Sequence, residues 1–511
     1  MPGKPNHSPK GYLKILTTFQ VAHPKENTMP ASKLLPIALA LLLTACTATQ
    51  IDRQSAIALP EHFQHTGQSN PAPNLARWWQ QWPDPQLARL IEQGLQHNHS
   101  IALAQSRLQE ARATARLAEA DLRPSAGLAA NAYGYRNHHR DPYLGNGGHL
   151  ASAGFSAAWE PDIFGQKSSD ADAARAAALG AQEQLHGSRL IISAQIAEHY
   201  LRAAHIQQQQ TLIAQQLATL GELARYIAGR FQAGHATAHD TNAIAAQIQA
   251  LEARQSTLQA QFDAEQRSIA VLTGQTPQSF RLDSEAMRRA APLQHLPAPP
   301  QGIQPAELLN QRPDIRARAA EVQARSALLA SAKADLLPRF NIQFLWQTGR
   351  IELNSDLAPL NRARSSNGGL FSIGVQLPLF TAGRIRANIQ AADARLQSAL
   401  IQYDQTLLQA LADVDNAYQA QHALAEQQQQ LQQAERTAQR QVRDDRQLFR
   451  YGRKTLDTAL QSQLAAIDHS QRLLDNRLAA GLNLLNLYKA IGSGWQQETS
   501  PPVATETAAK Q

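Results

Sequence analysis

The chain of 511 residues has 1 cysteine, 3 methionines and 5% aromatic residues. A disulfide framework and a thiolate metal cluster both need several cysteines, so neither can stabilise this fold. A long apolar run is also missing, because the only strongly apolar window, residues 34–43, is too short to span a bilayer as a helix. Alanine, glutamine, leucine and arginine dominate residues 86–489 instead. This composition is typical of long helices that pack through small side chains.

The apolar window belongs to a predicted leader. It follows Lys33 and precedes the sequence Leu-Thr-Ala-Cys that ends at Cys46. A basic start, an apolar stretch and small residues before a cysteine are similar to a bacterial lipoprotein signal, so we expect Cys46 to carry lipid such as palmitate. Thr47 follows instead of the aspartate that would indicate inner-membrane retention, which favours the outer membrane. Residues 1–28 have no periodic pattern, and translation is expected to begin at Met29.

The formal net charge of +7 does not predict a nucleic-acid partner. Residues 1–45 account for +4 of this charge, which leaves only +3 on the mature chain. Arginines and lysines are interleaved with aspartates and glutamates along the predicted helices, and no basic run interrupts them. We therefore interpret the charges as solvated helix faces.

The sequence contains one unit twice. The residues around Pro124 recur around Pro338 at an offset of 214, and Phe-Gln-Ala-Gly234 recurs as Phe-Arg-Tyr-Gly452 at an offset of 218. Each copy has the order helix, two strands, very long helix and returning helix, so the fold is predicted to be mainly α and internally duplicated. The predicted divisions are a leader, an N-terminal segment, a first copy, a linker, a second copy and a disordered tail, at residues 1–45, 46–85, 86–277, 278–304, 305–493 and 494–511.

The predicted strands alternate apolar and polar residues. They cover residues 125–136, 151–161, 339–348 and 369–380, and the glycine-rich segments 137–149 and 349–369 are predicted as loops. In the second copy a period of two places six apolar residues on one face: Phe340, Ile342, Phe344, Phe371, Ile373 and Val375. Taken alone, this alternation favours a half-buried sheet in a soluble protein. Beside the long helices, it favours a membrane barrel with these six residues facing lipid.

The apolar period changes to 3.6 after Gly165 and after Gly383. Long helices are predicted over residues 166–230 and 384–450, and a continuous helix of this length extends about 100 Å. A globular domain has no use for two such helices, whereas a structure that crosses the periplasm does.

Each long helix is predicted to reverse at a glycine. Gly234 and Gly452 follow the last periodic residues, where a left-handed glycine commonly ends a helix. The tips are predicted at residues 231–240 and 449–458. Threonine and aspartate side chains after each glycine can cap the returning helix: Thr237, Asp240, Thr455 and Asp457.

Four motifs carry a family resemblance. They are Trp-Trp-Gln-Gln-Trp82, Arg-Pro-Asp-Ile315, the segment from Gly374 to Arg384, and Leu-Tyr-Lys-Ala-Ile-Gly492. With the duplication, they identify residues 78–495 as similar to TolC-type outer-membrane efflux proteins of the lipoprotein branch related to nodulation protein T. The resemblance implies a homotrimer with a transmembrane 12-stranded β-barrel, four strands from each chain, continued by a periplasmic α-helical barrel. Four strands cannot close a barrel alone, and an open edge cannot face lipid.

The resemblance also implies the function. It predicts a passive exit duct in the outer membrane for an RND-type tripartite pump, with a periplasmic adaptor and an inner-membrane transporter as partners. Docking and the aperture would lie at the tips, at Gly234, Thr237, Asp240, Gly452, Thr455, Asp457 and Gln461. The family commonly has an acidic residue nine positions after the second glycine and a basic residue three further on. Gln461 and Leu464 occupy these places, so a typical ion-pair lock is not expected.

Competing chemistry has little support. His235 and His239 are spaced for one helix face, but a third metal ligand is not evident, so a capped helix start is favoured over a metal site. A nucleophile elbow and a complete phosphate loop are both missing from the sequence, and neither an enzyme nor a cofactor is predicted. The alternative function is a periplasmic adaptor lipoprotein. An adaptor would carry one hairpin beside lipoyl-like domains, whereas this sequence has two copies of the strand and hairpin unit.

Overall fold

The duplicated unit is visible in the order of helices and strands. The computed structural model describes residues 57–63, 75–141, 145–354 and 364–495, which all belong to one compact unit, 53–511. The first copy consists of α3 (His99–Ala120), β1 (Ser125–Asp141), β2 (Gly145–Trp159), α4 (Gln166–Gln232) and α5 (Ala238–Leu272). The second consists of α8 (Pro313–Ala334), β3 (Arg339–Asn354), β4 (Arg364–Gln376), α9 (Arg384–Arg450) and α10 (Leu456–Ala490).

Short elements precede and join the two copies. A 3-10 turn, η3 (Trp78–Gln81), leads into α2 (Pro85–His97), whose N-terminus is capped by Asp84. The connection between the copies contains α6 (Ser284–Ala290), η4 (Pro305–Glu307) and α7 (Leu308–Gln311). In the described ranges no helix has an apolar stretch long enough to cross a bilayer.

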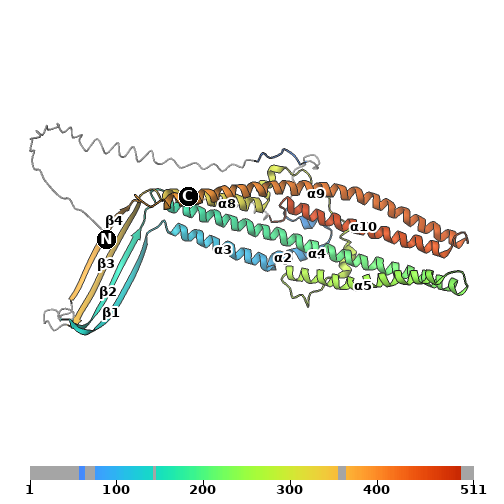
Figure 1. The fold of residues 1–511 in the computed structure, drawn as a ribbon, viewed down its shortest axis with the longest axis horizontal. Helices are drawn as coiled ribbons and strands as arrows, with labels where there is room; N and C mark the ends of the chain where they lie inside the picture. Colours follow the sequence, from blue (N-terminus) through green and yellow to red (C-terminus); the bar gives the residue numbers. More distant parts are fainter. Residues whose placement is uncertain (1–56, 64–74, 142–144, 355–363, 496–511) are drawn as a thin grey trace, which may run out of the picture. The chain divides into compact units, whose positions relative to one another are not determined.

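The four strands form one antiparallel sheet in the order β1-β2-β3-β4 (Figure 1). The strands are longer than predicted, because β1 continues to Asp141, β2 begins at Gly145, β3 continues to Asn354 and β4 begins at Arg364. Most of the segments predicted as loops, 137–149 and 349–369, are therefore strand. Backbone hydrogen bonds hold such a ladder together whatever its side chains, so polar, glycine-rich ends can remain paired.

The strand ends next to the long helices also differ from the prediction. β2 ends at Trp159 and β4 at Gln376, before the predicted ends at 161 and 380. Pro161 and Pro378 follow these strands, and a proline cannot donate a hydrogen bond to the ladder.

The two long helices are continuous over 67 residues each. Both begin after a left-handed glycine, Gly165 with φ 79° and Gly383 with φ 84°. Gly180 and Gly187 do not interrupt α4; a Cβ on either would lie 3.7–3.8 Å from Ala320 or Pro313 of α8. These small residues allow the backbones of α4 and α8 to approach closely.

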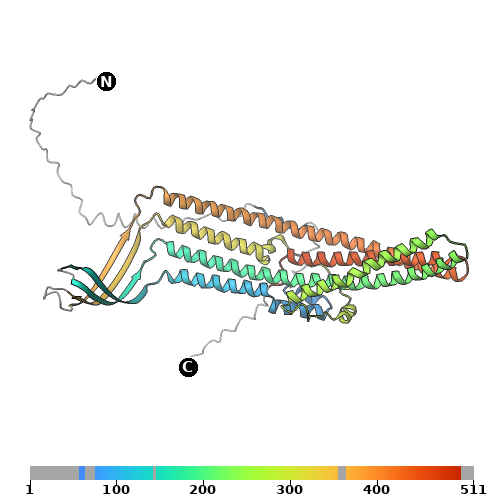
Figure 2. The same cartoon turned by 60° about the horizontal axis from the view of Figure 1, so that its bottom comes forward.

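The helices pack in pairs along two central helices. α4 contacts α3, α5, α8 and α10, whereas α9 contacts α8 and α10. Figure 2 shows α3 and α8 beside the halves of α4 and α9 nearest the strands, and α5 and α10 beside the distal halves. Because each long helix rises about 100 Å, its tip lies far from the sheet. The main core lies between these ends and is built around Tyr200, Ile196 and Tyr488.

Candidate functional site

The first tip joins α4 to α5 through a glycine turn. The His235 N–H donates to the Arg230 carbonyl at 2.8 Å, the Gly234 N–H donates to Phe231 at 3.0 Å, and Gly234 has φ 73°. Thr237 and Asp240 form a reciprocal capping box, in which the Thr237 N–H donates to Asp240 Oδ2 at 2.8 Å. These hydrogen bonds hold the pKa of Asp240 below its usual value. Backbone and capping hydrogen bonds thus define the turn, although it is exposed.

The second tip repeats this turn with a different cap. The Arg453 N–H donates to the Leu448 carbonyl at 2.8 Å, and Gly452 has φ 66°. Thr455 is the N-cap of α10, but its hydroxyl contacts the Thr458 hydroxyl at 3.0 Å and caps no backbone N–H. The predicted left-handed glycines are therefore confirmed at both tips, whereas side-chain capping is confirmed only at the first.

The carboxylates expected at the aperture are in unlike environments. Asp240 is exposed and engaged in its cap, whereas Asp457 is half-buried. In the described part of the chain, Asp457 Oδ1 is enclosed and accepts no hydrogen bond. Gln461 is exposed on α10. These differences leave the roles of the three residues at an aperture as predictions.

The second tip contains an ion pair that sequence reasoning missed. Lys454 in the turn donates to Asp445, whose side chain is only 4% exposed on α9. This hydrogen bond and the lysine charge lower the pKa of Asp445. Asp445 also follows Ala438 and Val442 at helical spacing, which places it on the buried stripe of α9. That spacing could have identified it as a buried acid in need of a partner.

A small apolar cluster holds the two hairpins together near the tips. Its buried members are Leu223 and Ile227 of α4, Ile244 of α5 and Leu460 of α10. Leu464, which occupies the place of a basic residue in the family pattern, packs against this cluster. The position therefore contributes apolar packing instead of charge.

The Arg-Pro-Asp-Ile motif joins three helices at the start of α8. Arg312 is 8% exposed and donates to Asp314 at 2.7 Å, to Asp413 of α9 at 3.4 Å and to the Ala490 carbonyl at the end of α10 at 2.9 Å. Burial alone would raise the pKa of Asp314, but the hydrogen bond and charge of Arg312 lower it overall. The motif is a structural clamp.

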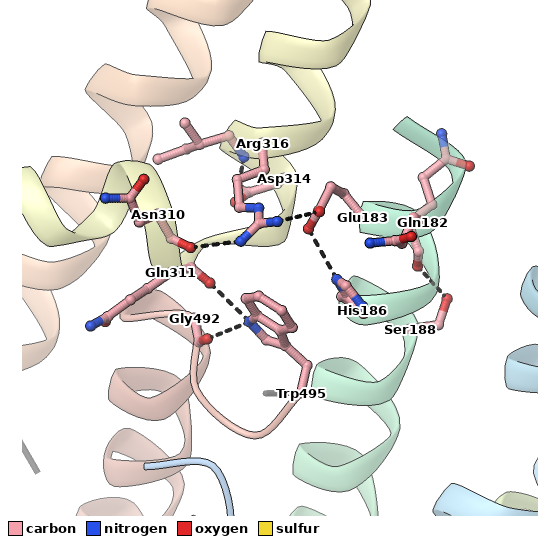
Figure 3. A network of polar contacts seen from close by, with 12 residues as sticks. Gln182, Glu183, His186, Ser188, Asn310, Gln311, Asp314, Arg316, Gly492 and Trp495 are labelled. Atoms are coloured by element: carbon pink, nitrogen blue, oxygen red, sulfur yellow. Dashed lines mark hydrogen bonds and ion pairs between the residues drawn. The ribbon is translucent and has the colours of Figure 1, made fainter. Parts of the chain in front are cut away.

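Trp495, five residues after the end of α10, completes a second clamp (Figure 3). The Trp495 indole N–H donates to the carbonyls of Gln311 and Gly492 at 2.8 Å each. Its ring stacks on His186 with centroids 4.3 Å apart, and the Arg316 guanidinium lies 5.1 Å from its centroid. Arg316 also pairs with the buried Glu183 of α4 at 2.6 Å. These contacts hold Trp495 between α4 and α8.

The tryptophan motif at residues 78–82 packs on the end of α10. Trp78 stacks on Tyr488 with ring centroids 5.0 Å apart, and Trp79 and Trp82 meet Trp78 edge to face. All three tryptophans are buried. The tryptophan motif is therefore part of the buried core at the end of α10.

The six apolar strand residues lie in directly opposed pairs. Phe340 pairs with Val375, Ile342 with Ile373, and Phe344 with Phe371. Trp159 and Ala157 of β2 continue the rows of Ile342 and Phe344, and Phe155 pairs with Trp346 one row further on. Phe371, Ile373 and Val375 are 63–64% exposed, a high exposure for large apolar side chains. One face of the sheet is therefore apolar and uncovered in a single chain.

Two predictions concern residues of other kinds. Cys46, the expected lipidation site, lies outside the described residues. His235 and His239 are both exposed at the first tip. In the part of the chain that the structure describes, no group of three histidine, cysteine or acidic side chains converges on a point that could hold a metal ion.

The duplicated helix and strand unit matches a known class of outer-membrane channel. A sequence profile of the family described as outer membrane efflux protein matches residues 90–275 and 305–493, about three quarters of the chain. The chain belongs to the outer membrane efflux protein family.

Individual relatives match along almost the whole chain. The cation efflux system protein CusC of Escherichia coli O6:H1 is 26% identical over 482 residues, which cover 92% of this chain and 100% of the relative. The pyoverdine export outer membrane protein OpmQ of Pseudomonas aeruginosa is 27% identical over 486 residues, 90% of this chain and 97% of the relative. The open state of the Neisseria gonorrhoeae MtrE outer membrane channel shares the fold, with a TM-score of 0.75, 22% identity, and coverage of 89% and 100%.

These findings confirm an efflux channel of the outer membrane. The family consists of channel proteins, and the alternative of a periplasmic adaptor is not supported. The predicted site residues at the tips and on the strands are tested by none of the comparisons, and they stay predictions.

Proposed function

We propose that three copies of the chain form one closed duct through the outer membrane. The observation that carries this proposal is the four-stranded sheet, whose outer strands β1 and β4 have no further partner strand in the described chain. Open edges cannot face lipid, and an apolar face cannot remain in water at no cost. Three such sheets joined edge to edge give twelve strands, with Phe340, Phe371 and their neighbours turned toward lipid.

The two helical hairpins extend this duct into the periplasm. Their tips, at Gly234 and Gly452, lie about 100 Å of helix away from the strands. We assign them as the docking and aperture region for a periplasmic adaptor, which links the duct to an inner-membrane transporter. Thr237, Asp240, Thr455, Asp457 and Gln461 belong to this region. Cys46 adds a lipid anchor, although the strands alone form the barrel.

The duct accepts whatever the transporter delivers. Two relatives of nearly equal identity are named for unlike cargoes, a cation and pyoverdine. A passive tunnel explains this range, because selection then takes place at the pump. The cargo of this chain is therefore set by its partners.

Three measurements test the duct. A closed trimeric barrel from an outer-membrane fraction changes its electrophoretic migration after heating, and the purified protein gives discrete conductance steps in a planar bilayer. Deletion of the gene from its host should raise sensitivity to exported compounds. A protein that migrates identically with and without heating and gives no conductance contradicts the proposal.

A further inference from the structure

The last turns of α9 carry an unusual number of arginines. Residues 435–454 contain seven cations and three carboxylates, a net charge of +4 in 20 residues, whereas the whole chain has +7 in 511. Five exposed arginines define what is called here the arginine stripe: Arg436, Arg440, Arg443, Arg446 and Arg450. At 100° per residue they lie within an arc of about 120° and extend over about 21 Å of the helix.

The acids of the same segment do not neutralise the arginine stripe. Asp445 points inward to Lys454, and Glu435 accepts a hydrogen bond from Ser470 at 2.6 Å. The third acid, Asp444, is exposed and lies outside the arc of the arginines. Among the described residues, no carboxylate lies within ion-pair distance of a stripe arginine; Arg440 donates to Thr437 and Arg446 to Gln463. Neighbouring arginines on a helix repel one another. Ion pairs with acidic side chains usually offset such repulsion on helix surfaces, and within the described chain the stripe has no such ion pairs.

The duplication provides an internal comparison. At the offset of 218, the stripe positions correspond to Ala218, Glu222, Arg225, Ala228 and Gln232 of α4, which carry no net charge. The two long helices are otherwise alike, with 67 residues and the same glycine turn. Turn formation and helix length therefore do not require the stripe, because α4 achieves both without it.

We infer that the arginine stripe binds an acidic helical surface of a periplasmic partner protein, and that this partner distinguishes the second hairpin from the first by charge. The inference rests on the proposed duct function. Guanidinium groups spaced by four, three, three and four residues match carboxylates repeated along the face of another helix. The stripe begins about 80 Å along α9 from the strands, so lipid of the outer membrane is out of reach.

A defined probe tests the charge complementarity. The full-length purified protein is titrated with a labelled helical peptide that carries glutamate along one face, and with a second peptide that has glutamine in those places. The glutamate peptide should bind, and its affinity should fall between 50 and 500 mM NaCl, since salt screens exposed charges. The glutamine peptide should bind at least about tenfold more weakly, because each exposed ion pair contributes a fewfold.

Matched variants locate the binding. Replacement of Arg436, Arg443 and Arg450 by glutamine should lower the affinity for the glutamate peptide about tenfold. Replacement of the same residues by lysine should retain most of that affinity. The control is the same replacement of Arg384, Arg386 and Arg395, exposed arginines in the first turns of α9, which changes the charge equally. Equal affinity in the stripe and control variants overturns the inference.

Other occupants give different results. Loss of the trimer in the stripe variant would show a contact between protomers, and binding of phosphatidylglycerol vesicles in place of the peptide would show a lipid site; either result overturns the inference. Failure of the duct itself is separate, because it would appear as missing conductance in the unaltered protein.

Discussion

The ion pair beneath the second tip predicts a local loss of stability. Lys454→Ala leaves the Asp445 carboxylate almost fully enclosed without its partner. Breaking a fully buried pair costs about 3 to 5 kcal/mol. The Lys454 side chain is 36% exposed, so water can replace part of the interaction. We therefore expect a cost of about 2 kcal/mol, which corresponds to roughly thirtyfold more frequent opening of the tip.

Hydrogen exchange measured by mass spectrometry on the purified protein detects this opening. Amides in the last turns of α9 and the first turns of α10 should exchange faster in Lys454→Ala, while those around Tyr488 remain protected. Arg453→Ala is the control, since Arg453 is the exposed neighbour and carries the same charge. If both variants exchange alike, the pair does not stabilise the tip.

The same pair has a defined pH dependence. The pKa of Asp445 is lowered in the folded chain, so its contribution to stability is present above the ordinary aspartate pKa, at about pH 4, and is lost as the pH falls through the lowered value. The difference between Lys454→Ala and the unaltered protein should therefore persist from about pH 5 to 8 and shrink below about pH 4.

Three further outcomes are expected. Cys46→Ser should abolish palmitate labelling but allow trimers to form, and labelling equal to the unaltered protein would disprove lipidation at this residue. Phe371→Arg should reduce trimer yield, at a cost on the order of 2 kcal/mol if the side chain faces lipid, whereas Ser372→Arg on the opposite face should cost much less; equal yields would refute the assigned faces. Gly452→Val should strain the left-handed turn and impair efflux and adaptor crosslinking with normal trimer levels, and loss of the trimer would make the residue purely structural.

The order of helices and strands could be predicted because short local sequence signals mark where each one begins and ends. Prolines 124 and 338 follow the ends of α3 and α8, the change from period two to period 3.6 marks the starts of α4 and α9, and Gly234 and Gly452 mark their ends. The sequence could not show how far the strands continue, since polar residues at their outer ends pair through the backbone alone. Side-chain patterns contain no record of that pairing.

The contacts that the sequence did not predict join residues that only the folded chain brings together. Trp78 contacts Tyr488 only because η3 packs on the end of α10. Lys454 contacts Asp445 only because the chain reverses at Gly452. The arginine stripe was missed for another reason. Interleaved charges predict solvated helix faces, but the order of residues alone does not show that Asp445 faces inward while its arginine neighbours face outward.

The middle of the helical region has a large buried core, whereas few apolar side chains are buried near the two tips. The main core gathers α2, both long helices and the residues after α10, with Arg312 and Trp495 as clamps. Among the described residues near the tips, the separate apolar cluster has only four buried members, two of them on α4. Local opening is least costly where few apolar groups are buried. The aperture proposed at the tips is therefore expected to change shape while the clamps keep the long helices in register.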